Sequence, residues 1–286
     1  MDPCQHYRRF KAFVFQVANL YQNPNLLDDA PCKQSYKDYF FHYYHSLLGR
    51  QISELKSRHI QWFRKLLPVL TLPPGSSILD FGGGYGMDTL FLASCGYNMV
   101  FYEKTPNHIA ICRHLKNACE GVIGPLSIKT VLAGDVPNEL FGNVDAIVVN
   151  EVAHHIEPPS TVFLKAHDLL RESGSLFLVE PNFFNPLVHA YFFRVRGFRT
   201  VLKKVDAASG TVIRVGNEHI RPAMSWNAIA KQSGFYLVDA TYSCRFGIKE
   251  GTSENRIVCR RSLELFPVIR QAVSSHITFQ YRKKKR

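Results

Sequence analysis

The 286-residue sequence lacks features typical of secreted, zinc-binding or membrane-spanning proteins. Its seven cysteines are an odd number without a CxxC pair, which disfavours a disulfide framework or a structural zinc site. No apolar run is long enough to span a bilayer. The N-terminus carries a basic stretch and then apolar residues, but Gln16 and Asn19 interrupt them, which favours an amphipathic helix over a signal peptide. We therefore expect a cytoplasmic protein with reduced, mostly buried thiols.

Two segments supply the whole net charge of +12. Residues 190–221 hold seven Lys or Arg and two Asp or Glu, and residues 260–286 hold eight and one. The remaining chain holds 20 residues of each sign and is neutral. Such basic segments attract the phosphates of lipids, nucleic acids or phosphorylated substrates.

From residue 77 onward, apolar stretches of strand length alternate with helical patterns. Helices are expected at about 86–95, 106–119, 160–171 and 226–233, the last capped by Ser225. The alternation is typical of an α/β protein with a mostly parallel sheet and helices on both faces. The expected strands are 77–81, 98–103, 126–132, 144–149, 175–180, 235–242 and about 255–259.

Three segments fall outside this alternation, and they define the predicted organisation. Residues 1–72 form a helical N-terminal extension whose aromatic stretch 36–49 either closes a pocket or packs in the core. Residues 73–260 form the α/β domain, with an insertion at 181–223. Residues 261–286 form a basic C-terminal tail.

The segment DFGGGYG, residues 80–86, joins the first expected strand to a helix. The dinucleotide pattern G-x-G-x-x-G fails, because Met87 or Thr89 stands where its third glycine belongs. The P-loop pattern fails as well, since no Lys-Ser or Lys-Thr pair follows. Asp80 would repel a pyrophosphate but suit a cation, and Glu103 at the end of the second strand suits a ribose diol. S-adenosylmethionine (SAM) is such a cationic, ribose-bearing ligand without phosphate.

Five motifs in order resemble those of class I SAM-dependent methyltransferases, in the small-molecule group called types 11 and 12. They are LDFGGGYG, VFYEKTP, VLAGDVP, DAIVVNEVAHHIEPP and LLRESGSLFLVEPN, and the resemblance covers about residues 75–260. It implies a Rossmann-like fold with a seven-stranded, mostly parallel sheet and SAM as cofactor. The cofactor-binding residues that it implies are Asp80, Phe81, Gly82, Gly84, Gly86, Glu103, Lys104, Asp135, Val136 and Asn150.

A general base is needed only if the acceptor loses a proton, because a sulfonium methyl group is already activated. His154 and His219 are the candidate catalytic residues, since imidazole titrates near neutrality. The alternative is that both histidines only pack in their loops, His219 beside Arg221, which is also a candidate anion anchor. Glu180 either faces the acceptor or orients a neighbouring side chain.

The acceptor is expected to be small and apolar or lipid-like, and to be methylated on oxygen or carbon. The fourth strand is not followed by an Asn-Pro-Pro-Tyr-like segment, which disfavours amino groups of nucleic-acid bases. No acidic pair of the catechol type or cysteine cluster suggests a metal. A methyltransferase acting on RNA or protein through the basic tail, and a non-catalytic binding protein, remain open alternatives.

Aromatic residues and cations alternate in the insertion, which indicates either a lid over an apolar pocket or a helix at an anionic membrane surface. Phe279 and Tyr281, just before the closing RKKKR, suit the same membrane interpretation. The five cations of the insertion are Arg194, Arg196, Arg199, Lys203 and Lys204.

Overall fold

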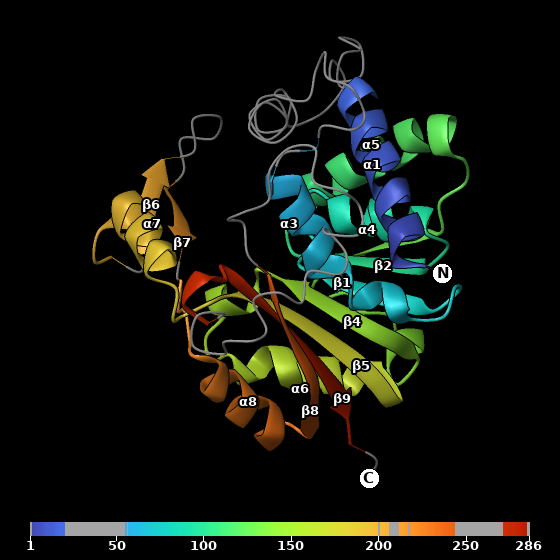
Figure 1. The fold of residues 1–286 in the computed structure, drawn as a ribbon. Coiled ribbons are helices and arrows are strands. Elements are labelled where there is room, and N and C mark those ends of the chain that lie inside the picture. Colours follow the sequence, from blue (N-terminus) through green and yellow to red (C-terminus); the bar gives the residue numbers. More distant parts are fainter. Residues whose placement is uncertain are drawn as a thin grey trace.

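The computed structural model describes residues 2–20, 55, 57–199, 201–205, 212–216, 218–243 and 271–284 (Figure 1). These residues build a seven-stranded sheet of order β3-β2-β1-β4-β5-β9-β8, in which only β9 runs antiparallel to its neighbours. The predicted Rossmann-like α/β fold is thereby confirmed. The strands are β1 (Ser77–Phe81), β2 (Asn98–Glu103), β3 (Ile128–Leu132), β4 (Val144–Asn150), β5 (Leu170–Pro181), β8 (Phe235–Ser243) and β9 (His276–Lys283).

The sequence analysis predicted a basic tail at residues 261–286 and an α/β domain that ends at residue 260. Both predictions are wrong, because β9 belongs to the main sheet. Phe279 and Tyr281 are buried in the core and do not suit a membrane contact. The Lys283 ammonium donates to the backbone carbonyls of His167 and Leu170. The apolar residues alternate along this segment, as a half-buried strand requires. The strand expected at about 255–259 lies outside the described residues.

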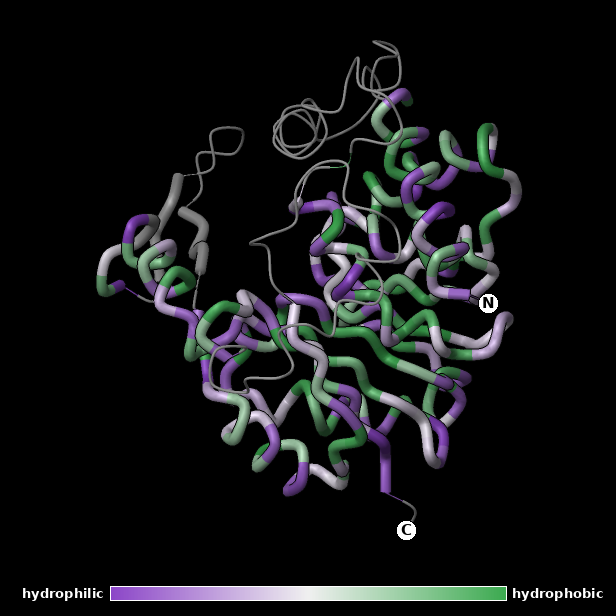
Figure 2. The backbone as a smooth tube through the Cα atoms, in the orientation of Figure 1, coloured by the Kyte–Doolittle hydropathy of each residue, from purple (hydrophilic) through white to green (hydrophobic). Residues whose placement is uncertain are grey.

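Successive strand residues enter two apolar clusters, one on each face of the sheet. Ile78 and Ala146 face one cluster, whereas Leu79 and Ile147 face the other, as the two-residue period of a strand requires. The strands therefore form an apolar band through the centre of the molecule (Figure 2).

The helices that follow the strands cover both faces. On the first face, α4 (Met87–Ser94) and α5 (Pro106–Ile123) pack against β2 and β3; on the other, α6 (Ser160–Leu169) and α8 (Ala223–Gln232) pack against β5 and β8. Helix α8 begins earlier than predicted, with Pro222 as its N-cap and Ser225 inside it. The predicted capping role of Ser225 is therefore wrong. Short 3-10 turns lie at Asn138–Leu140 and Ala153–His155.

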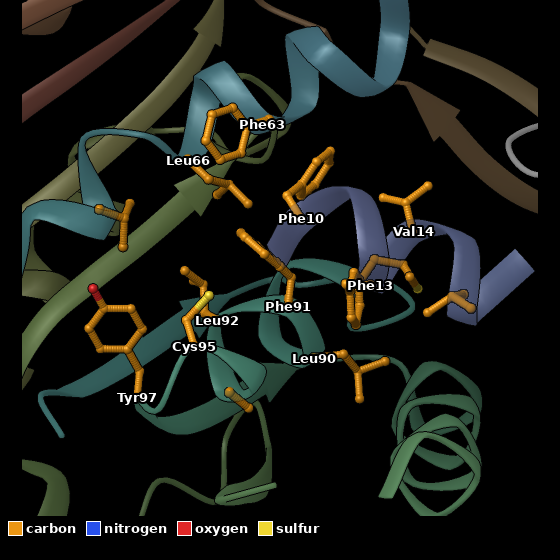
Figure 3. Packing of buried hydrophobic residues seen from close by; sticks show 14 of the residues in the cluster. Phe10, Phe13, Val14, Phe63, Leu66, Leu90, Phe91, Leu92, Cys95 and Tyr97 are labelled. Atoms are coloured by element: carbon orange, nitrogen blue, oxygen red, sulfur yellow. The ribbon is translucent and has the colours of Figure 1, made fainter. Parts of the chain in front are cut away.

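The N-terminal helices complete the first face of the sheet. Helices α1 (Pro3–Leu20) and α3 (Ser57–Leu66) precede a 3-10 turn at Val69–Thr71. The Phe10 ring centroid lies 5.3 Å from that of Phe63 and 5.0 Å from that of Phe91 (Figure 3). The predicted helical extension is confirmed for these residues, and it shares its core with the sheet. The aromatic stretch 36–49 lies outside the described residues.

The segment between β5 and α8 stands beside the main sheet (Figure 1). It contains α7 (Pro186–Arg196), β6 (Val201–Val205) and β7 (Val212–Gly216), and the two strands pair only with each other. The Asn185 side chain caps α7 by accepting from the N–H groups of Leu187 and Val188. An insertion at this point was predicted.

Four cysteines lie within the described residues, and all are free thiols. Cys95, Cys112 and Cys119 are buried, and burial raises the pKa of the Cys95 thiol to about 11 and of the Cys119 thiol to about 12. Such thiols are unreactive near neutral pH. The expectation of reduced, mostly buried cysteines is confirmed for these four.

Candidate active site

The glycine turn leaves β1 at Phe81 and enters α4 at Met87. Gly82, Gly84 and Gly86 have φ values of 73°, 56° and 82°, a left-handed conformation that strongly favours glycine. A methyl group on Gly83 would lie 2.4 Å from the Asp80 carboxylate. A methyl group on Gly84 would meet no atom within 4 Å. The turn is therefore packed tightly against the Asp80 side chain at Gly83 and is open at Gly84, where a ligand can approach the backbone.

Glu103 joins the end of β2 to this turn. Its Oε2 accepts from the Gly84 N–H at 3.0 Å, and its Oε1 accepts from the N–H groups of Lys104 and Thr105 at 2.9 and 3.0 Å. Burial opposes its ionisation, but the charge of His108, whose Nδ1 lies 3.7 Å from Glu103 Oε1, and the backbone N–H groups hold the pKa of Glu103 below the ordinary value. An ionised carboxylate thus lies against the turn, and its predicted contact with a ribose diol stays a prediction.

Asp80 lies on the packed side of the turn, against Gly83, and not on the open side at Gly84. Its side chain is buried, and its Oδ2 accepts from the Thr89 hydroxyl at 2.6 Å. Burial, and then the nearby Asp88 carboxylate, raise the pKa of Asp80 to about 8. The structure therefore places the Asp80 carboxylate against Gly83, and its predicted contact with a cationic ligand stays a prediction.

The predicted adenine-side residues lie at the ends of β2 and β3, which are neighbours in the sheet. Asp135 is exposed on the loop after β3, and Val136 packs half-buried on the apolar cluster that also holds Phe81. The backbone pairs Glu103 with Leu132, so this loop begins beside Glu103. Lys104 is exposed. The structure therefore gathers these residues at one end of the glycine turn.

A further carboxylate, which the sequence analysis missed, lies where the turn enters α4. Asp88, in the first turn of α4, accepts from Trp62 Nε1 through Oδ1 at 2.5 Å and from Asn150 Nδ2 through Oδ2 at 2.7 Å. Burial raises its pKa, while the two hydrogen bonds oppose the rise. Its place two residues after the last glycine was a visible signal. The partnership with Trp62 was not, because α3 and α4 meet only in the folded chain.

His154, in the 3-10 turn after β4, and Glu180, near the end of β5, form a buried pair. His154 Nδ1 lies 2.7 Å from Glu180 Oε2, and Glu180 Oε1 accepts from the Ala153 N–H at 3.0 Å. Although burial acts in the opposite direction, the hydrogen bond and charge of Glu180 raise the pKa of His154. With Nδ1–H donated to the carboxylate, Nε2 carries the lone pair. This is the arrangement of a base whose tautomer is fixed by an acid.

His219 reaches back to the same loop through its backbone. Its N–H donates to the His154 carbonyl at 2.8 Å, and its ring nitrogen Nδ1 lies 3.8 Å from Glu157 Oε1. Arg221 forms an ion pair with Glu157 and stacks over Trp226, 5.4 Å from the ring centroid. The structure therefore brings His219 beside His154. It also neutralises Arg221, whose predicted role as a free anion anchor it does not support.

A polar cluster of side chains from α3, from β9 and from the residue after β4 lies at the carboxyl ends of the parallel strands. Lys65 and His276 both bind Glu151 Oε1, the second at 3.0 Å, and Gln61 Nε2 contacts His276 Nδ1 at 2.8 Å. Glu151 has a φ of 58°, which is unusual for a residue other than glycine. Sequence reasoning missed this cluster because its members are far apart along the chain.

No group of three or more His, Cys, Asp or Glu side chains is arranged to hold a metal ion in the part of the chain that the structure describes. The acids and histidines of the edge are instead paired with one another, as His154 is with Glu180.

Comparison with known proteins assigns this arrangement to a family. A family model described as a methyltransferase domain matches residues 52–240, more than half of the chain. The ubiquinone biosynthesis O-methyltransferase of Pseudomonas aeruginosa strain UCBPP-PA14 is 28% identical over 129 residues, which cover 45% of this chain and 53% of that protein. The chain thus spans about half the length of the curated relatives it matches.

Two solved structures share the fold at low sequence identity. A SAM-dependent methyltransferase from Methanosarcina mazei superimposes with a TM-score of 0.53 and 14% identity, over 77% of this chain and 98% of that chain. A structure described as a candidate sarcosine dimethylglycine methyltransferase from Galdieria sulphuraria also has a TM-score of 0.53 and 14% identity, over 88% and 99% of the chains. At this identity the likeness concerns the fold alone.

The raised pKa of Asp80 predicts that the ligand-free protein loses stability as pH rises. The folded state keeps a proton on Asp80 up to about pH 8, whereas the unfolded chain releases it near the ordinary value of 3.8. The contribution is therefore complete at acid pH and lost as pH rises through about 8. The groups acting on Asp80 are Thr89, Asp88 and Glu103, and the Cys112 thiol lies beside it.

Thermal unfolding of the wild type and of Asp80→Asn, measured from about pH 5 to about pH 8.5, checks this linkage. The asparagine can still accept from Thr89 but does not titrate. We expect the melting temperature of the wild type to fall with pH more steeply than that of the variant. Parallel profiles would show that Asp80 is already ionised across this range.

Proposed function

The chain belongs to the methyltransferase domain family and has the class I SAM-dependent methyltransferase fold, and from this premise we propose that it transfers a methyl group from SAM to a small acceptor. The observation that carries the proposal is the glycine turn, open above Gly84 and bordered by the ionised Glu103. These residues fit the cofactor, because the open backbone admits a flat ligand and the carboxylate suits a ribose diol. The buried Asn150 Oδ1, which has no hydrogen-bond partner among the described residues, offers a further acceptor.

The candidate cofactor-binding residues would hold the two parts of the cofactor at the two ends of the glycine turn. Asp135 and Val136 lie at the adenine end, Glu103 beside them, and Asn150 at the methionine end. When bound, SAM supplies an activated methyl group on a sulfonium. The protein then has to hold the acceptor in line with that methyl group and exclude water.

His154 is our candidate for the general base. Glu180 holds its Nδ1–H, so Nε2 is left to take the proton of an acceptor hydroxyl. His219 is the alternative base, since its backbone N–H donates to the His154 carbonyl from the segment before α8 and its side chain is more exposed. An oxygen acceptor is favoured because the curated relatives are named O-methyltransferases. Methylation of carbon, or of RNA or protein, remains a weaker alternative.

A membrane surface is the partner that the insertion suggests. Leu187, Tyr191 and Phe193 of α7 are exposed, and Phe198 just beyond the helix is 95% exposed. Arg194 and Arg199 are exposed among them. Aromatic side chains between cations suit the interface of an anionic bilayer. None of the described helices combines the length and apolar character that a bilayer crossing requires, so the proposal is peripheral contact by a protein that acts on a lipid-like acceptor.

Calorimetry with SAM tests the cofactor assignment. The Glu103→Ala variant should bind SAM more weakly by about 1.5–3 kcal/mol, as expected for the loss of hydrogen bonds to a charged group. The exposed carboxylate of Glu139, which pairs with Lys129, gives the matched control, and Glu139→Ala should bind as the wild type does. Binding of NAD in place of SAM, or equal SAM affinity in both variants, would contradict the assignment.

Turnover of a hydroxyl acceptor tests the base. His154→Ala should lower kcat by about 10²–10⁴ with SAM binding retained, whereas His114→Ala on α5 should leave it unchanged. Because Glu180 raises the pKa of His154, wild-type activity should rise with pH through that pKa, and Glu180→Gln should shift the rise to lower pH. If His219→Ala alone abolishes turnover, the roles are reversed. If neither variant matters, positioning alone carries the reaction.

Co-sedimentation with vesicles of phosphatidylglycerol and phosphatidylcholine tests the membrane contact. Each basic residue near an anionic surface contributes about 1 kcal/mol, so binding should weaken with salt and in the double variant Arg194→Gln, Arg199→Gln. Replacing Leu187, Tyr191 and Phe198 by serine should abolish it. Leu164→Ser, at an equally exposed site on α6, is the control. A gel shift with RNA at the same salt and no vesicle binding would contradict the proposal.

A further inference from the structure

Residues 218–222, called the strap from here on, link β7 to α8 and contact the turn that carries His154. The His219 N–H donates to the His154 carbonyl at 2.8 Å. The turn, Ala153–His155, is a short 3-10 turn closed by backbone hydrogen bonds of 3.0 and 3.1 Å. Hydrogen-bond geometry is poor in such turns. Contacts from outside the turn therefore contribute to fixing the position of His154.

Arg221 joins the strap to the same loop at a second point. Its Nη1 donates to the His219 carbonyl at 2.9 Å, and its Nη2 donates to the carboxylate of Glu157. Glu157 belongs to the loop that directly follows the His154 turn. Because the guanidinium is a rigid planar fork, these two bonds fix the strap relative to this loop. Both backbone groups of His219 are thereby engaged, the N–H by His154 and the carbonyl by Arg221.

A third contact connects Arg221 to the core. Its guanidinium carbon lies 5.4 Å from the ring centroid of Trp226 on α8, within the range of a cation–π interaction. Trp226 is buried in the apolar cluster on this face of the sheet. The Arg221 and Glu157 side chains are 20% and 37% exposed, and an ion pair with such exposure adds little to stability. The contacts instead provide a fixed position for the strap.

Two separate elements therefore hold His154. Strand β5 holds its ring, because Glu180 Oε2 lies 2.7 Å from Nδ1. The strap holds its backbone, through the hydrogen bond from the His219 N–H. A general base must lie within hydrogen-bond reach of the proton that it removes, and misplacement by about 1 Å can lower a rate by about 10². A residue that fixes the backbone of His154 can therefore control the rate without touching the reacting atoms.

We propose that Arg221 is a positioning residue for His154. Its guanidinium joins the strap to the loop of the candidate base, and so keeps Nε2 in the place from which it takes the acceptor proton. The inference rests on the proposed function, with His154 as the base. It gives Arg221 a role in place of the predicted anion anchor, with Glu157 as its partner.

Proton NMR of the full chain tests the positioning without an acceptor. The His154 Nδ1 proton, buried against Glu180, should give a signal downfield of the backbone amides, identified by its absence in His154→Ala. Arg221→Gln should broaden or remove this signal, because a turn released from the strap lets water reach the proton. Glu157→Gln should keep the signal, since the amide oxygen still accepts from Arg221.

Turnover with labelled SAM tests the consequence for the reaction, with octyl gallate, an apolar phenol, as the acceptor probe. Arg221→Gln should lower kcat roughly 10- to 100-fold, while KM for SAM stays unchanged. In a His154→Ala background the same replacement should have no further effect, because no base is left to position. A loss that came only from weakened folding would appear in both backgrounds.

Arg171 provides the matched control. Its Nε lies 2.8 Å from Asp145 Oδ1, near the start of β5 and so at the opposite end of that strand from Glu180. Arg171→Gln removes an arginine–carboxylate pair of the same kind, and it should leave both the NMR signal and kcat unchanged. Both arginine variants should melt close to the wild-type temperature, because each loses only a partly exposed ion pair.

The outcomes that contradict the inference are distinct from those that contradict the function. An unchanged Nδ1 signal in Arg221→Gln, or an equal fall in kcat with and without His154, would overturn the role of Arg221 alone. Wild-type turnover in His154→Ala would overturn the base assignment, and the inference with it. If the wild type did not bind SAM in calorimetry, the proposed function itself would fall, and the inference with it.

Discussion

Both faces of the mostly parallel sheet are apolar, and the rest of the structure depends on covering them. Helices α6 and α8 cover one face. On the other, α4 and α5 are completed by α1 and α3, through rings such as Phe10 and Phe63 packed on Phe91. Because burial of apolar surface is the main favourable term in folding, α3 is fixed by its apolar side. Its polar side, with Trp62 and Lys65, is thereby carried to the carboxyl ends of the strands.

At those ends the protein buries several carboxylates, and the way each is satisfied separates their roles. Glu103 accepts three backbone N–H groups and stays ionised. Glu180 is matched by a histidine. Asp80 and Asp88 receive only neutral donors, and burial raises the pKa of each. Burial raises the pKa of Glu180 as well, and groups whose ionisation the fold disfavours are typical of functional sites.

The two basic segments form different parts of the structure. The second supplies β9, where Phe279 and Tyr281 fill the core between β5 and β8. The first includes α7, whose apolar side chains are exposed. A helix that shows apolar residues to solvent is unusual in a globular protein, and its cations are close by in the sequence. Both segments leave cations exposed, Arg194 and Arg199 in the first and Arg282 and Lys284 in the second.

The sequence by itself determined the α/β class, six of the seven strands of the main sheet, the glycine turn and Glu103, because these depend on local patterns of two and 3.6 residues and on turn chemistry. It also named His154 and His219 as candidate bases, but their proximity comes from the tertiary structure. Only the tertiary structure decided that residues 276–283 form a strand of the main sheet between β5 and β8, that Asp80 is buried against Gly83, and that Asp88 accepts from Trp62 of α3 and Asn150 of β4. The reason is physical: a side chain's partner across the fold depends on which elements the apolar clusters bring together, and no pattern of neighbouring residues records that.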